Sequence, residues 1–177
     1  MCIRDRWVNP QPGQSIADLG AGGGYFTFRY AARVGPAGHV SAVDVDWRMV
    51  RKIAWEATAR GVTNVSAVLA PFDDYGLGQQ RFDTVLMINT GAFQSCEPER
   101  NRSYIQQIAD SLRPGGRFVY TDSTRYPPSP EEPSCNAVPE GELLALFQTR
   151  FTVAQREEGG VDNPKTISYL LEVRPAP

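Results

Sequence analysis

The residues best suited to chemistry lie in "IADLGAGGGYFT", residues 16–27, where glycines follow a short apolar run. Gly20, Gly22 and Gly24 stand where a strand is expected to give way to a helix, and Ala21 separates the first two. Glycine adopts positive φ angles readily and carries no Cβ, so a ligand can come very close to the backbone. The loop therefore predicts a ligand site in preference to a plain tight turn.

A carboxylate at the end of the next apolar run strengthens this prediction. Asp44, in "SAVDVD", lies about 20 residues past the glycines, where an acid can accept both hydroxyls of a ribose. Asp46 competes for this role, but it is better placed to cap the helix that follows. Together, the glycine loop and Asp44 predict a ligand that contains a nucleoside.

The spacing of the glycines narrows the choice of nucleoside ligand. The dinucleotide fingerprint G-x-G-x-x-G would need its last glycine where Tyr25 or Thr27 stands, and no P-loop lysine follows the loop. The pattern present is D-x-G-x-G-x-G, from Asp18 to Gly24. A carboxylate at Asp18 would repel a pyrophosphate and would suit a cationic group. An NAD(P)-dependent oxidoreductase is therefore kept only as an alternative.

The elements that must position these residues alternate along the chain. Nearly continuous apolar runs predict the buried strands of a parallel sheet, and amphipathic stretches between them predict helices. The expected strands are 15–19, 39–45, 64–70, 81–89, 117–122, 151–158 and 166–173. A turn-rich link between the last two suits an antiparallel hairpin. The expected fold class is α/β, a doubly wound, Rossmann-like, seven-stranded, mostly parallel sheet with a C-terminal antiparallel strand.

Length and charge limit the domain organisation and the partners. The chain has 177 residues and a net charge of −2. We expect a single domain over 15–177, preceded by a short or artefactual segment over 1–14, because "MCIRDR" fits no helix or strand pattern well. The acidic balance argues against a nucleic-acid partner. No apolar run approaches the ~20 residues that cross a membrane.

The side chains that could do catalysis are few. His39 is the only histidine and opens a strand at the edge away from the glycines, which argues against Ser–His–Asp and Cys–His hydrolases. No cluster has metal-ligand spacing, so we expect no metal site. Three cysteines suggest reduced thiols, and a cytoplasmic location is the default expectation.

Residues after the fourth and fifth strands lie at the ligand edge of the expected sheet. Phe93 is a candidate wall for an acceptor, and Asp122 and Tyr126 are candidate proton acceptors or acceptor contacts. We interpret Cys96 as an incidental thiol in a loop and not as a nucleophile. Each of these residues fits a structural role as well as a functional one, so no catalytic residue is assigned.

Four motifs resemble those of the class I S-adenosylmethionine-dependent methyltransferases. They are "ADLGAGGG", "VSAVDVD", "RFDTVLMIN" and "LRPGGRFVYTD", and the resemblance extends from Ser15 to the carboxyl terminus. Within the class, the sequence is similar to small bacterial enzymes described as type 11 or type 25-like methyltransferases. These enzymes usually carry helices ahead of the first strand, so the resemblance also implies a truncated amino terminus and a more open site.

The resemblance implies a role for each matching position. Residues that would hold the aminocarboxypropyl part of S-adenosylmethionine are Asp18, Gly20, Ala21, Gly22 and Gly24. Asp44 would bind the ribose, and Val45 would pack on adenine. Phe72 and Asp73 match the place where the edge of adenine is bound, although Pro71 and Phe72 replace the usual acid–small residue pair. Asn89 would complete the methionine end.

The resemblance implies an enzyme that moves a methyl group from S-adenosylmethionine to a small-molecule acceptor. A good nucleophile would need no base, whereas an acceptor hydroxyl or amine would need a group that takes its proton. A methyltransferase-like domain that binds a nucleoside without catalysis is the second alternative. The acceptor and the oligomeric state do not follow from the sequence.

Overall fold

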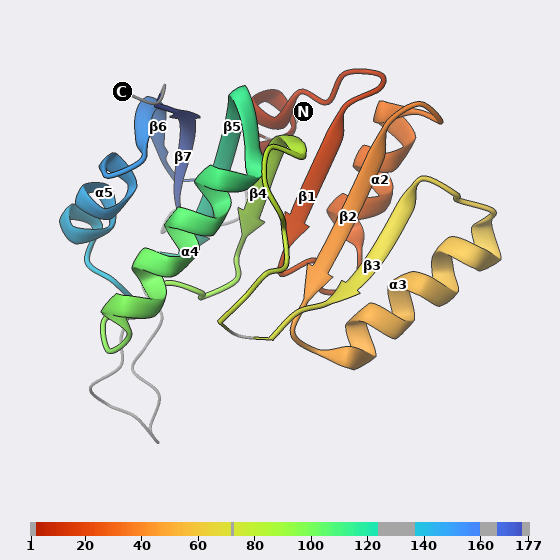
Figure 1. Cartoon of the computed structure of the whole chain (residues 1–177), viewed down its shortest axis with the longest axis horizontal. Coiled ribbons are helices and arrows are strands. Elements are labelled where there is room, and N and C mark those ends of the chain that lie inside the picture. Colours follow the sequence, from red (N-terminus) through yellow and green to blue (C-terminus); the bar gives the residue numbers. More distant parts are fainter. Residues whose placement is uncertain (1–2, 72, 124–136, 160–165, 175–177) are drawn as a thin grey trace.

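The computed structural model describes residues 3–71, 73–123, 137–159 and 166–174 (Figure 1). Helices and strands alternate from the amino terminus to β5, except that β4 follows β3 with no helix between them. The elements are α1 (Ile3–Val8), β1 (Ser15–Leu19), α2 (Tyr25–Val34), β2 (His39–Asp44), α3 (Trp47–Arg60), β3 (Val65–Leu69), β4 (Phe82–Ile88), α4 (Pro98–Ser111), β5 (Leu112–Ser123), α5 (Glu140–Gln148), β6 (Phe151–Glu158) and β7 (Thr166–Val173).

All seven strands belong to one sheet with the order β3-β2-β1-β4-β5-β7-β6. The pairs from β3 to β5 are parallel, whereas β7 runs antiparallel to both β5 and β6. The expected fold class is therefore confirmed, including its C-terminal antiparallel strand. Strand order reverses between β1 and β4, which is where an open α/β sheet places its ligands.

Alternate side chains of each strand enter two apolar clusters, one on each face of the sheet. Leu19 and Met87 pack with α4 and α5 on one face. Ile16 and Leu86 pack with α1 and α2 on the other. The period of two in the strands thus explains why helices cover both faces, as Figure 1 shows for α4 and α2.

An aromatic cluster fixes the segment that follows β4. The Phe93 ring lies 5.6 Å from Tyr120 on β5 and 5.7 Å from Phe147 on α5, both in edge-to-face geometry. Phe147 is fully buried and also contacts Phe118 and Tyr169. Buried aromatic pairs of this kind are favourable beyond the area they bury. The cluster therefore holds the chain after β4 in place at the edge of the sheet where the strands end.

The amino-terminal prediction is wrong in one respect. The pattern of "MCIRDR" predicts no helix, but Ile3–Val8 forms α1. Trp7 and Val8 are only 3% and 0% exposed, and they pack against α2 and the sheet. Within the described ranges, every helix is too short or too polar to cross a membrane.

Candidate functional site

The glycine loop connects β1 to α2 and lies close to the chain that follows β4. Gly20, Gly22 and Gly24 have φ angles of 67°, 52° and 81°. A Cβ on Gly20 would lie 2.5 Å from Thr90 Cγ2, whereas a Cβ on Gly22 would meet open space. The Gly20 N–H donates to the Val43 carbonyl at 2.8 Å, which ties the loop to the end of β2. The loop is thus fixed in place with the Gly22 position uncovered.

Asp44 sits at the end of β2 with both carboxylate oxygens anchored. Its Oδ2 accepts the Gly22 N–H at 2.7 Å, and its Oδ1 accepts the Asp46 N–H at 2.9 Å. A carboxylate has about four lone-pair sites, so each oxygen can still accept a hydroxyl. Asp46 instead accepts the Arg48 N–H at 2.8 Å and caps α3, which confirms its expected role.

Asp18 is turned toward α2 and is 3% exposed. Its Oδ2 accepts the Thr27 hydroxyl at 2.6 Å, which links β1 to the first turn of α2. Burial raises the pKa of Asp18 to about 6, and the Thr27 hydrogen bonds only partly oppose this rise. A role at the aminocarboxypropyl group stays a prediction, because Asp18 does not line the main cavity described below.

The raised pKa of Asp18 predicts a pH-dependent stability. The folded state holds a proton on Asp18 up to about pH 6, whereas the unfolded chain releases it near its ordinary value of 3.8. Stability is therefore expected to fall by about 3 kcal/mol as pH rises from about 4 to above 6, and then to level off. Urea unfolding at pH 3.5 to 7.5 measures this fall, and Asp18→Asn should remove it. An equal slope in the variant and the wild type would contradict the assignment.

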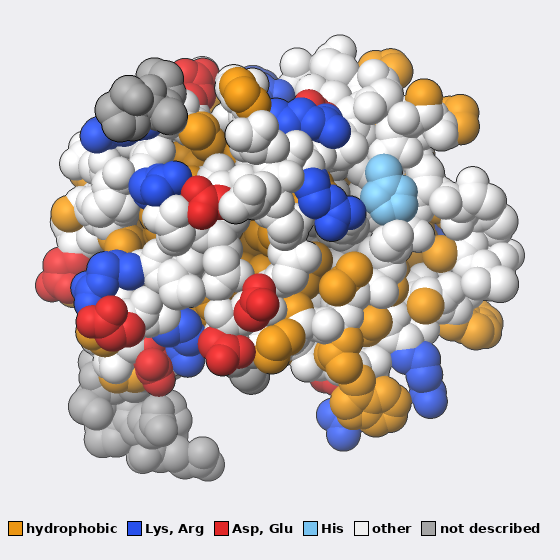
Figure 2. Space-filling model, in the orientation of Figure 1, with side chains coloured by type: hydrophobic (Ala, Val, Ile, Leu, Met, Phe, Trp, Pro, Cys, Tyr) orange, Lys and Arg blue, Asp and Glu red, His pale blue; other side chains and the backbone are white. Residues whose placement is uncertain are grey.

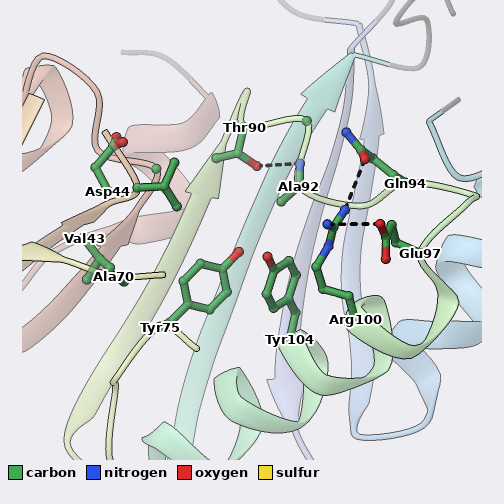
Figure 3. A pocket seen from close by; sticks show the side chains of 13 residues that line it. Val43, Asp44, Ala70, Tyr75, Thr90, Ala92, Gln94, Glu97, Arg100 and Tyr104 are labelled. Carbon is green, nitrogen blue, oxygen red and sulfur yellow. Dashed lines mark hydrogen bonds and ion pairs between the residues drawn. The ribbon is translucent and has the colours of Figure 1, made fainter. Parts of the chain in front are cut away.

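A cavity of about 400 Å³ opens at the carboxyl ends of the central strands (Figure 3). It extends from the end of β2, across the loops that follow β1, β3 and β4, to the first turns of α4. The residues that line it are Gly20, Val43, Asp44, Val45, Ala70, Tyr75, Thr90, Gly91, Ala92, Gln94, Glu97, Arg100 and Tyr104. Of the residues predicted from sequence, the structure therefore brings Gly20, Asp44 and Val45 together here.

Two buried tyrosines form part of the cavity wall. Tyr75 lies in the chain after β3 and Tyr104 on α4, and their ring centroids are 4.6 Å apart. Burial raises the pKa of both phenols. Both phenols are therefore protonated near neutral pH, which makes them hydrogen-bonding groups rather than bases.

Arg100 lies at the α4 end of the cavity and is paired on two sides. Its guanidinium donates to Gln94 Oε1 at 3.1 Å and lies 3.5 Å from Glu97 Oε1. It also lies 5.9 Å from the centre of the Tyr104 ring. Its Nε is buried and has no hydrogen-bond partner among the described residues. Because the Nε is buried, the groups of Arg100 that can meet a ligand are its terminal guanidinium nitrogens, which already contact Gln94 and Glu97.

The other described residues that were predicted from sequence are not among those that line this cavity. Asp73 and Asn89 are exposed, and Phe72 lies outside the described residues. Ala21, Gly22 and Gly24 belong to the loop but do not line the cavity, so all these assignments stay predictions. His39 is the first residue of β2 and lies at the end of the strand opposite the glycine loop. Its Nε2 lies 3.0 Å from Ser66 Oγ.

A second cavity, of about 230 Å³, lies where β4 and β5 end and β7 begins. Phe93 and Tyr120 form aromatic walls, and the buried Asp122 accepts the Gly91 N–H at 3.0 Å. Gly91 lines both cavities, so no side chain at that position separates them. Phe93 and Asp122 thus lie in the predicted acceptor region, whereas Tyr126 lies outside the described residues.

Two further expectations came from the sequence: reduced cysteine thiols and no metal site. Cys96 is disulfide-bonded, so the expectation of reduced thiols is wrong at this residue. Among the residues that the structure describes, no group of three or more His, Cys, Asp or Glu side chains could hold a metal ion.

Of the thirteen residues that line the main cavity, only Gly20, Asp44 and Val45 were named as site residues from the sequence. The side chains that were not named include Tyr75, Gln94, Glu97, Arg100 and Tyr104. The available signal was the spacing of Arg100 and Tyr104, which stand on one helix face four residues apart. That spacing does not show which cavity the face meets.

Comparisons with known proteins bear on what this site does. A family model described as "Methyltransferase domain" matches residues 16–116, more than half of the chain. Nocamycin O-methyltransferase from Saccharothrix syringae is 37% identical over 125 residues, which cover 71% of this chain and 43% of that protein. Aklanonic acid methyltransferase DauC from Streptomyces sp. (strain C5) is 30% identical over 112 residues, 63% of this chain and 49% of that protein.

A solved structure agrees with the fold. A SAM dependent methyltransferase from Aquifex aeolicus superimposes with a TM-score of 0.78 at 17% identity, covering 97% of this chain and 88% of that one. At this identity the likeness concerns the fold alone. The chain spans less than half the length of the two curated relatives named above.

Proposed function

Since this chain belongs to the methyltransferase domain family, we propose that it transfers the methyl group of S-adenosylmethionine to a small-molecule acceptor. The family match confirms the resemblance to class I S-adenosylmethionine-dependent methyltransferases, and it sets aside the NAD(P)-dependent alternative. The observation that carries the proposal is the anchored Asp44 carboxylate, which lines the same cavity as the glycine loop.

The residues present fit the methyl donor. Asp44 keeps acceptor capacity on both oxygens for the two ribose hydroxyls, and Val45 offers an apolar surface for adenine. The volume of about 400 Å³ lies within the range of small-molecule sites. Gly20 leaves room beside Thr90 that a Cβ would fill. The loop from Gly20 to Gly24, with Asp18 behind it, would hold the aminocarboxypropyl group, and Asn89 would complete that end.

The second cavity suits the acceptor. S-adenosylmethionine supplies a methyl group on a sulfonium, and positioning and exclusion of water account for much of the catalysis of such transfers. A cavity of about 150 Å³ holds benzene, so about 230 Å³ accommodates a substituted single ring. Phe93 and Tyr120 would flank this ring, and Asp122 would take a proton from its hydroxyl or amine.

Two further observations support a small-molecule acceptor. The names of both curated relatives refer to small molecules, nocamycin and aklanonic acid. Figure 2 shows basic and acidic side chains interspersed over one face, without a continuous basic stripe of the kind that binds nucleic acid.

Calorimetric titration of the purified chain with S-adenosylhomocysteine, with NAD as the comparison ligand, tests the cofactor class. We expect micromolar binding of S-adenosylhomocysteine and none of NAD, because Tyr25 and Thr27 replace the last glycine of the dinucleotide fingerprint. Binding of NAD alone would refute the proposal. Binding of S-adenosylhomocysteine without methyl transfer to any of a broad set of acceptors would favour the non-catalytic alternative.

A further inference from the structure

We propose that the edge of adenine is recognised by Glu97 and Arg100 on the α4 side of the main cavity, and not by residues directly after β3. This assignment rests on the proposed function, because it concerns the nucleoside of the same methyl donor. It identifies two residues that set the base specificity of the site.

The chain directly after β3 is poorly suited to read a base edge. Pro71 has no backbone N–H to donate, and its side chain neither donates nor accepts a hydrogen bond. Asp73 is the first acid after β3, but it is exposed and does not line the main cavity. Ala70 and Tyr75 are the residues of this chain segment that line it.

The opposite wall carries the polar groups instead. Figure 3 shows Asp44 at one end of the cavity and the side chains of Glu97 and Arg100 at the other, with Tyr75 and Tyr104 between them. A ribose bound to Asp44 would therefore direct its base over the two tyrosines toward α4. Aromatic and apolar surfaces suit the faces of a purine, which leaves the base edge to the charged pair.

The charged pair has the hydrogen-bonding pattern that adenine requires. Adenine presents its exocyclic N6–H donor next to a ring-nitrogen acceptor. Glu97 offers a carboxylate acceptor, and the neighbouring Arg100, which also lines the cavity, offers the N–H donors of its terminal guanidinium nitrogens. Hypoxanthine carries a carbonyl oxygen in place of the amino group and a ring N1–H in place of the ring-nitrogen acceptor, so its donor and acceptor positions are exchanged and do not match a Glu97–Arg100 pair placed for adenine. The site should therefore discriminate between these two bases.

Titration calorimetry with S-adenosylhomocysteine and with S-inosylhomocysteine tests this assignment without any turnover. The wild-type chain is expected to bind the adenine compound at least tenfold more tightly than the hypoxanthine compound. Glu97→Gln should weaken binding of the adenine compound about tenfold and abolish the discrimination, because an amide can donate to the carbonyl of hypoxanthine. Arg100→Met should weaken binding of both compounds.

Glu99→Gln is the matched control, since Glu99 lies on the same helix, is largely exposed and pairs with Arg102. This variant should bind both compounds as the wild type does. Wild-type binding of S-adenosylhomocysteine that persists unchanged in both Glu97→Gln and Arg100→Met overturns the assignment and leaves the proposed function standing. Equal wild-type affinity for the two compounds overturns it as well. A wild-type chain that binds neither compound overturns the proposed function first.

Discussion

Asp44→Ala is expected to weaken binding of S-adenosylhomocysteine by about 1.5–3 kcal/mol, or roughly 10- to 150-fold. The reason is that the Asp44 carboxylate is proposed to accept both ribose hydroxyls, and hydrogen bonds to a charged acceptor are the stronger kind. The carboxylate is already fixed by two backbone N–H groups, so binding costs little side-chain ordering in the wild type. Calorimetric titration of the two proteins measures the change.

Asp46→Ala provides the matched control for Asp44→Ala, because it removes the same charge two residues further along the chain. It deletes the cap of α3, in which Asp46 accepts the Arg48 N–H, and should lower the free energy of unfolding by about 1 kcal/mol. Binding of S-adenosylhomocysteine should stay close to that of the wild type. Equal affinities of the Asp44→Ala variant and the wild type, with the fold intact by circular dichroism, would refute the ribose role.

Much of the fold, and three of the thirteen residues that line the main cavity, could be predicted from sequence, because the signals involved are local. Strands buried on both faces appear as continuous apolar runs, and the glycine loop and Asp44 follow directly from strand ends. The capping role of Asp46 was also predictable. A residue in position to cap a helix satisfies backbone N–H groups only a few residues away, and this needs no tertiary information.

The parts that could not be predicted depend on tertiary packing. α1 is a six-residue helix, too short to be stable alone, and it persists because Trp7 and Val8 are buried against α2 and the sheet. Arg100 reaches the cavity only because of the way α4 is oriented on the sheet. The hydrogen bond from the Thr27 hydroxyl to Asp18 was likewise not predicted from the sequence. Rotamer choices of this kind depend on neighbours that a linear pattern does not reveal.

Gly20→Ala is expected to lower the free energy of unfolding by about 2–5 kcal/mol. Alanine at the left-handed φ of 67° costs about 1–2 kcal/mol, and its Cβ, 2.5 Å from Thr90 Cγ2, adds an overpacking cost of about 1–3 kcal/mol. Since Gly20 and Thr90 both line the main cavity, displacement of Thr90 should also weaken binding of S-adenosylhomocysteine about tenfold or more. Urea unfolding and calorimetric titration measure the two effects.

Gly22→Ala separates backbone strain from steric overlap, because this glycine also has a positive φ, of 52°, but an added Cβ there meets open space. It should lower stability by only about 1–2 kcal/mol. The double variant Gly20→Ala/Thr90→Ser removes Cγ2 and keeps the hydroxyl that accepts the Ala92 N–H, so it should recover most of the difference between the two single variants. Equal destabilisation by Gly20→Ala and Gly22→Ala, with no recovery in the double variant, would show that Thr90 does not require a glycine at position 20. In that case, the contact between Gly20 and Thr90 would not determine the shape of the cavity.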